Sequence, residues 1–372
     1  MQDTHKMTRR RMLEAFMAGT LGMVAGETIS GQSQTRADSP QPAPLPTDKE
    51  ITGDPRVRGP FPILSTPYTE SGDVDYEVLA KSARFVDWCG CSGMIWPQSG
   101  DSIDLLTMDE KLKGMEVLAQ TMKGRKTALC LGVQGKTIDE MLVYARHVEK
   151  LEPTAIISRP MGNAKTDDEL RDYWHALMEV VHRPVIIQTA AGGCNPSVQL
   201  LKDLGAESPY FGYVKEETKP IMQRMKELVA AKPVIKCVFS AMGGFAWLHQ
   251  CRIGTEGLIT ERAVYADLLM KIWNSYECGD LTTASDAFGK FLLMLNLRET
   301  IPCQELRGYH LYVWQKRGVF KNRLSREYGP GNSIPEKPII ANMELSQESM
   351  DEIDMRFETL KPFLKEGTFT DD

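Results

Sequence analysis

Residues 184–216 read PVIIQTAAGGCNPSVQLLKDLGAESPYFGYVKE and contain one helix pattern between two strand patterns. The runs Pro184–Ala190 and Tyr210–Glu216 are short, apolar and rich in β-branched or aromatic residues, which favours buried strands. Between them, Val198–Leu204 places apolar residues at helical spacing. A strand, a helix and a second strand in this order predict a unit of two parallel strands joined by a helix.

The same unit recurs along the chain. The expected strands are Phe61–Pro67, Gly93–Pro97, Thr127–Val133, Ala155–Pro160, Pro184–Ala190, Tyr210–Glu216, Pro233–Ser240 and Thr255–Thr260. The expected helices are Val74–Val86, Asp109–Met122, Ile138–Leu151, Glu169–Val181, Val198–Leu204, Ile221–Ala231, Phe245–Arg252 and Ala263–Tyr276. Eight such units predict an α/β fold, a closed (β/α)8 TIM barrel. The alternative, an open doubly wound sheet, usually has fewer units and a Gly-rich loop after its first strand, where this chain has Thr66-Pro67-Tyr68.

Further helix patterns follow the barrel. Leu281–Leu297, Glu305–Gly318 and Gln347–Leu364 have helical spacing, and a Pro/Gly-rich loop covers Gly329–Pro338. We therefore expect the barrel at residues 51–278 and a C-terminal helical extension at residues 279–372.

Residues 1–50 carry a different pattern. Arg9 and Arg10 precede a short apolar stretch, Ala15–Ala25, and Pro residues alternate in an extended linker from Gly31 to Glu50. This resembles a twin-arginine export signal, so we expect a periplasmic or cell-envelope protein in a bacterium, with no integral membrane span after signal removal. The alternative is an amphipathic N-terminal helix with a chance arginine run, in a cytoplasmic protein.

Composition excludes several classes of protein. The 372 residues carry a net charge of −6, and no Lys/Arg stripe runs along the body, which argues against a nucleic-acid partner. Of the eight cysteines, Cys89 and Cys91 are the pair that lies close together in the sequence. The cysteines show neither the pattern of a disulfide framework nor the spacing of a zinc site. We expect no metal and no nucleotide cofactor.

Barrel enzymes place their chemistry at the carboxyl ends of the strands. Polar residues follow six of the expected strands there: Ser65, Thr66, Tyr68, Gln98, Ser99, Asp101, Arg159, Asn163, Gln188, Thr189, Lys215, Glu216, Glu217 and Ser240.

Lys215 is unusual because it ends a strand of a barrel whose interior should be apolar. Loss of hydration there favours the neutral amine, which can attack a carbonyl and form a Schiff base. The alternative is a solvent-facing lysine paired with Glu216 or Glu217.

Several segments carry a resemblance to a known family. They are Thr66-Pro67-Tyr68, Gly72-Asp73-Val74-Asp75, Pro97-Gln98-Ser99-Gly100-Asp101, Gly212-Tyr213-Val214-Lys215-Glu216 and Gly254–Ile259. From Gly59 to Pro330 the chain resembles the dihydrodipicolinate synthase / N-acetylneuraminate lyase family. The resemblance implies a class I Schiff-base aldolase on a (β/α)8 barrel, with Lys215 as the imine-forming lysine.

Other site residues follow from the same resemblance. Gln98, Ser99 and Gly100 fall on the family's Gly-Thr-Thr-Gly-Glu loop, which binds the keto-acid carboxylate. Ser99 keeps a hydroxyl and Asp101 a carboxylate, but Pro97 and Gln98 replace the Gly and the first Thr.

The largest departure lies on the fifth strand, where the family has a proton-relaying tyrosine. Gln188 and Thr189 stand there, and glutamine is neither an acid nor a base. This disfavours dihydrodipicolinate synthesis itself.

We therefore expect a Schiff-base lyase or aldolase acting on a 2-keto acid or sugar acid. Ser99 would bind the carboxylate or relay a proton, Asp101 would support its loop, and Gln188 and Thr189 would shape the pocket. The role of the missing tyrosine would pass to Ser99, Tyr68 or a water molecule.

Arg159 would contact an anion, cap a helix or pair with an acid.

Alternative functions are a catalytically silent ligand-binding protein and a sugar-acid dehydratase. The resemblance also implies a homo-oligomer, a dimer or tetramer.

Overall fold

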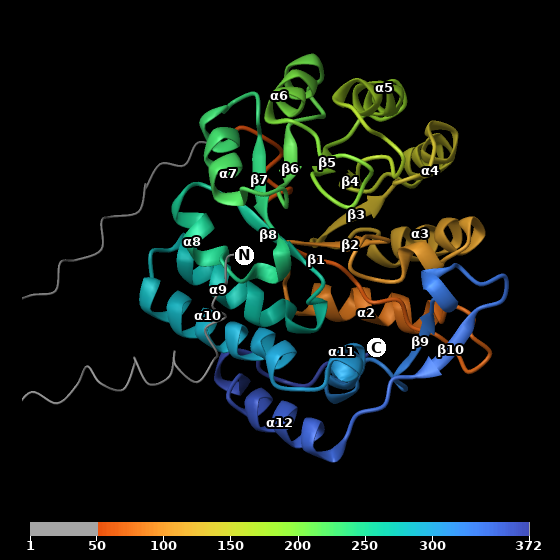
Figure 1. Ribbon diagram of the computed structural model, residues 1–372. Helices are drawn as coiled ribbons and strands as arrows, with labels where there is room; N and C mark the ends of the chain where they lie inside the picture. The colour runs from red at the N-terminus through yellow and green to blue at the C-terminus, as the bar shows by residue number, and fades with distance from the viewer. Residues whose placement is uncertain (1–50, 372) are drawn as a thin grey trace, which may run out of the picture. The chain divides into compact units, whose positions relative to one another are not determined.

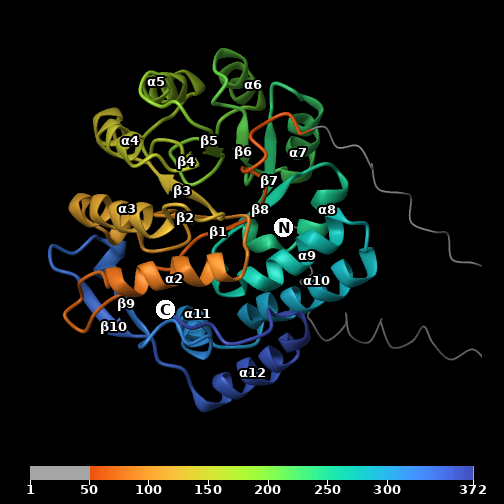
Figure 2. The ribbon, with the colours of Figure 1, turned by 180° about the vertical axis from the view of Figure 1, so that it is seen from behind.

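The computed structural model describes residues 51–371, and parallel strands occupy their centre with helices around them (Figures 1 and 2). The strands are β1 (Gly59–Pro62), β2 (Gly93–Trp96), β3 (Ala128–Gly132), β4 (Ala155–Ser158), β5 (Val185–Gln188), β6 (Tyr213–Lys215), β7 (Cys237–Ser240) and β8 (Gly257–Thr260). They pair in the order β1-β8-β7-β6-β5-β4-β3-β2, and a parallel bridge between Ile63 and Ile95 brings β1 next to β2. This confirms the predicted (β/α)8 barrel. The expected export signal and linker lie outside the described residues.

The helices alternate with the strands and then continue beyond them. They are α2 (Tyr76–Trp88), α3 (Met108–Met122), α4 (Ile138–Leu151), α5 (Asp167–Met178), α6 (Val198–Glu207), α7 (Ile221–Ala230), α8 (Trp247–Arg252), α9 (Ala266–Glu277), α10 (Leu281–Leu295), α11 (Leu306–Lys316) and α12 (Gln347–Glu358). Short 3-10 turns lie at Ile103–Leu105, Met242–Gly244, Ala263–Tyr265, Asn296–Glu299, Cys303–Glu305, Pro330–Asn332 and Lys361–Phe363.

Polar caps fix where the barrel helices begin. The hydroxyls of Thr107, Thr137 and Thr166 accept hydrogen bonds from the backbone N–H groups of Glu110, Glu140 and Glu169, three residues on. These caps satisfy donors that have no partner inside the helix. They hold the loops between strands and helices, where the strand-end residues lie.

Two apolar layers form on the two faces of the strands. Ile157, Ile186, Tyr213 and Phe239 belong to the cluster inside the barrel, whereas Ile187 and Val214 pack outward against the helices. Because strand side chains alternate, the residue two places after each inward residue also faces inward, at the mouth of the barrel. This applies to Arg159, Gln188 and Lys215.

The C-terminal region departs from the sequence prediction in two places. The helix expected at Gln347–Leu364 ends at Glu358, and Pro362 lies in a separate turn, because proline has no N–H for the helix hydrogen bond and its ring clashes with the carbonyl four residues earlier. A hairpin of β9 (Leu324–Glu327) and β10 (Ile339–Asn342) flanks the loop that was expected at 329–338. The short, polar β9 carries no apolar run that would have revealed it.

Arg326 fastens this hairpin to the barrel. Its guanidinium pairs with Glu110 of α3 at 2.5 Å, donates to the carbonyl oxygens of Gly72 and Leu105, and lies 4.9 Å from the centre of the Tyr68 ring. Figure 1 shows the hairpin beside α2 and α3. A guanidinium that is 3 % exposed keeps its charge at low cost when every donor has a partner.

Glu110→Gln should lower the free energy of unfolding by about 3 kcal/mol, because it leaves the buried Arg326 charge without a counter-charge. Glutamine still suits the helix cap at Thr107, so the loss reports on the ion pair. Urea denaturation measures it. Glu299→Gln is the control: Glu299 and Arg298 are 66 % and 59 % exposed, and we expect a change within about 0.5 kcal/mol. Equal losses in the two variants would contradict the assignment.

Candidate active site at the carboxyl ends of the strands

Lys215 ends β6 and faces the barrel interior. Its side chain is 4 % exposed, and its Nζ lies 3.3 Å from Oε1 of Glu217. Gln188 of β5 is its neighbour in the sheet register and donates from Nε2 to Oε2 of Glu217 at 2.7 Å. Lys215 is therefore not solvent-facing, although it does pair with one of the two glutamates that follow it.

Glu216 faces the opposite way. Its buried carboxylate pairs with Arg224 of α7 at 3.2 Å and accepts hydrogen bonds from the Thr189 hydroxyl at 2.8 Å and the Thr218 N–H at 2.6 Å. The Thr189 hydroxyl in turn accepts from the N–H of Glu217 at 2.8 Å. Thr189 thus fixes the turn that brings Glu217 back over Lys215, instead of presenting its hydroxyl to the mouth.

Arg159 extends from the end of β4 to the loop after β2. Its guanidinium donates to the Ser99 hydroxyl at 2.9 Å and pairs with Asp104 at 2.6 Å. Of the expected roles, pairing with an acid is therefore observed, and the same group also reaches the loop after β2. Because the paired residues Ser158 and Ile187 immediately precede Arg159 and Gln188, Arg159, Gln188 and Lys215 occupy adjacent inward positions on β4, β5 and β6.

Three glutamine side chains also lie at the strand ends. Gln98 accepts at Oε1 from the Ser99 N–H at 2.6 Å and from Nε2 of Gln134 at 3.1 Å. Gln98 Nε2, Gln134 Oε1 and Gln188 Oε1 are buried without a hydrogen-bond partner. Buried polar atoms are rarely left unpaired, so these atoms offer hydrogen bonds to a polar ligand.

Asp101 supports the loop that carries Ser99. Its carboxylate accepts from the N–H of Thr66 at 3.1 Å and from the Thr66 hydroxyl, and that hydroxyl accepts from Trp96 Nε1 at 3.0 Å. Burial raises the pKa of Asp101 and outweighs these hydrogen bonds, which act to lower it. The expected role of Asp101 as a loop support agrees with these contacts.

A cavity of about 180 Å³ lies beside this loop, between the ends of β1, β2 and β8 and helix α11. Gly100 and Asp101 line it together with Arg307 and His310, two residues that the sequence analysis did not single out. Gly100 has a φ of +99°, a conformation that favours glycine. Burial and, to a smaller extent, the charge of Arg262 lower the pKa of His310 well below its usual value.

Tyr68 follows β1 and contacts the C-terminal region of the chain. Its ring packs under the Arg326 guanidinium, and its backbone carbonyl accepts from Asn322 at 3.1 Å. Burial raises the pKa of its phenol far above the ordinary value. These contacts bind Tyr68 to the C-terminal hairpin.

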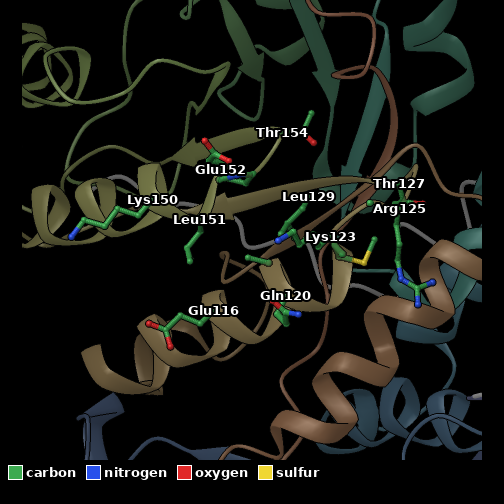
Figure 3. A pocket seen from close by; sticks show the side chains of 14 residues that line it. Glu116, Gln120, Lys123, Arg125, Thr127, Leu129, Lys150, Leu151, Glu152 and Thr154 are labelled. Carbon is green, nitrogen blue, oxygen red and sulfur yellow. The ribbon is translucent and has the colours of Figure 1, made fainter.

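A separate cavity of about 610 Å³ opens where α3 and α4 end, near the start of β3 (Figure 3). It contains none of the expected site residues. Within residues 51–371, no three His, Cys, Asp or Glu side chains gather as a metal site would require. None of the helices in that range has the length and apolar character needed to cross a bilayer.

A (β/α)8 barrel with a buried, inward-facing lysine at the end of its sixth strand has the arrangement expected of a Schiff-base lyase or aldolase scaffold. Residues 56–301 match the Dihydrodipicolinate synthetase family. The chain belongs to this family, as the sequence motifs predicted.

Its relatives are distant. The chain is 23 % identical to the 4-hydroxy-tetrahydrodipicolinate synthase of Chlorobium chlorochromatii over 67 % of its own length and 85 % of the relative. It is 25 % identical to an uncharacterized DapA-like lyase of Pyrococcus abyssi, over 58 % of its own length and 73 % of the relative.

Solved structures share the fold. The dihydrodipicolinate synthase of Rhodopseudomonas palustris superposes with a TM-score of 0.69 at 18 % identity, covering 82 % of this chain and 98 % of that one. The N-acetylneuraminate lyase of Proteus mirabilis gives a TM-score of 0.67 at 16 % identity, covering 83 % and 99 %.

The raised pKa of Asp101 has a consequence for stability. The folded state holds this proton more tightly than the unfolded state, so the contribution is full below the ordinary pKa of 3.8 and is lost as the pH rises through the folded value. Asp101→Asn, which cannot ionise, should remove this part of the pH dependence. Urea unfolding of both proteins at several pH values measures it, and identical slopes would refute the assignment.

Proposed function

We propose that this chain is a Schiff-base-forming lyase or aldolase that acts on a 2-keto acid or sugar acid through Lys215. The observation that carries the proposal is the position of Lys215: inward, buried, and in contact with a carboxylate at the mouth of the barrel. A carboxylate beside the amine can take up its proton, and a neutral amine then attacks the keto carbon. The resulting iminium withdraws electrons from the bond that breaks or forms.

The neighbouring strand ends suit the rest of such a substrate. Arg159 supplies a cation two strands away from Lys215, and Ser99 lies within its hydrogen-bonding reach at 2.9 Å. A guanidinium recognises carboxylates well, and strands are about 4.8 Å apart. We expect the substrate to bind with its carboxylate at Arg159 and Ser99 and to extend from there toward Lys215.

Dihydrodipicolinate synthesis is not the activity we propose. Gln188 stands where a proton-relaying tyrosine is expected, and its amide is engaged by Glu217 at 2.7 Å. A glutamine cannot pass a proton to a substrate. We therefore expect cleavage or condensation of a different keto acid, with the same imine.

Borohydride should reduce the imine formed with pyruvate or another 2-keto acid and leave a stable adduct on Lys215, because reduction converts the C=N bond into a secondary amine. Mass spectrometry of the digested protein locates the adduct. Lys215→Ala should abolish it. Lys111→Arg is the matched control, since Lys111 is also a buried lysine but lies on α3 beside the Tyr144 ring.

The alternatives give different results. A catalytically silent binding protein would be stabilised by a ligand equally well after Lys215→Ala, and no adduct would form with any keto acid tested. A sugar-acid dehydratase would form the adduct but release water and leave the carbon chain intact, which product analysis detects.

We also propose that the protein is exported by a twin-arginine-like signal. The support is the Arg9-Arg10 pair ahead of the apolar stretch Ala15–Ala25. Replacing both arginines with lysine in the native host should keep the protein in the cytoplasm, as cell fractionation would show. Unchanged fractionation would refute export by this route.

A further inference from the structure

We propose that Glu217 is the acid–base group for imine formation at Lys215. This inference rests on the proposed function and names the residue that moves the protons. The proposal is based on one contact in the structure. The carboxylate of Glu217 lies 3.3 Å from the amine of Lys215, which must lose protons to form the imine, and the Glu217 side chain is only 13 % exposed.

The other groups around Lys215 are unsuited to this task. Glu216 faces away from the mouth, where Arg224 and the hydroxyl of Thr189 hold its carboxylate. The Thr189 hydroxyl is fully engaged, since it donates to Glu216 and accepts from the Glu217 N–H. Gln188, the register neighbour of Lys215, has no titratable proton.

The two oxygens of Glu217 have separate partners. Oε2 accepts a hydrogen bond from Gln188 Nε2 at 2.7 Å, while Oε1 faces Nζ of Lys215. The backbone of Glu217 is fixed by the Thr189 hydroxyl at 2.8 Å. A base that is held at both its backbone and one oxygen needs little reorganisation when it transfers a proton. Gln188 is the positioning residue in this arrangement.

The proton balance of the step closes on Glu217. The carboxylate takes one proton from the Lys215 ammonium, and the neutral amine attacks the keto carbon. A C–N bond forms, the C=O π bond breaks, and the new oxyanion takes the proton back from Glu217. The carboxylate then removes a second proton from nitrogen and delivers it to the carbinolamine hydroxyl. The C–O bond breaks, water leaves, and the nitrogen lone pair completes the C=N bond.

The products are one iminium and one water molecule, with Glu217 returned to its ionised form. Ammonium and iminium carry the same charge, so the Glu217 carboxylate faces a cation before and after the step. The buried ion pair is therefore present at the beginning and at the end of the step, when both groups are charged.

The test compares the rate of imine formation in the full-length protein, trapped with cyanoborohydride and pyruvate and followed by mass spectrometry. Glu217→Gln should slow it by about 100-fold or more, the usual contribution of a positioned acid–base group. Glu217→Ala should be equally slow and should regain part of the rate when formate is added, because a small carboxylate can occupy the space left by the side chain. Circular dichroism verifies the fold of each variant.

Glu256→Gln is the matched control. Glu256 is also a buried glutamate paired with a lysine, Lys232, at 3.0 Å, but it lies immediately before the start of β8, away from the mouth. Its replacement should leave the rate unchanged. If Glu217→Gln does not fold, Glu217→Asp replaces it, and its withdrawn carboxylate should also slow the step.

Each outcome decides a separate claim. Wild-type rates in the Glu217 variants, or no response of Glu217→Ala to formate, would overturn the role of Glu217 and leave Lys215 as the imine-forming residue. Absence of any adduct in the wild-type protein across several 2-keto acids would overturn the proposed function itself.

Discussion

The pairing of β5 with β6 sets the chemistry of the barrel mouth. Gln188 lies opposite Lys215 in this parallel ladder, and alternate residues of each strand face the interior. A slip of one residue would turn Lys215 toward α7 and bring Glu216 inside. The observed register instead gives each residue a suitable partner: Lys215 meets Glu217, and Glu216 meets Arg224.

Burial of these charges is tolerated because each has a counter-charge and hydrogen bonds. An isolated buried charge is expensive, whereas a paired and hydrogen-bonded one is not. The same rule applies to Arg326, which joins the C-terminal hairpin to α3 through Glu110. The mouth and the hairpin are linked through the Asp101 loop, since Tyr68 packs under Arg326 and Thr66 binds Asp101.

Much of the fold follows from patterns along the chain. The eight alternating units, the start of α4 at Ile138 and the place of Lys215 at the end of the sixth strand are local features of the sequence. Each comes from apolar periodicity or from a cap such as Thr137. The β9–β10 hairpin was not predicted from the sequence, because no apolar alternation marks β9. The hairpin is held instead by the contact between Arg326 and the distant Glu110.

The amino-acid sequence alone specified a (β/α)8 barrel of a recognisable family with a lysine at the end of its sixth strand. Periodicity and short motifs carry that information because neighbouring residues generate it. Only the assembly of separate strands decided in which direction the two glutamates after Lys215 point. It also decided that the Thr189 hydroxyl binds the Glu217 backbone and that Arg159 binds Ser99. These contacts join residues that are far apart in the chain, and side-chain partners of that kind are chosen by packing and electrostatics in three dimensions.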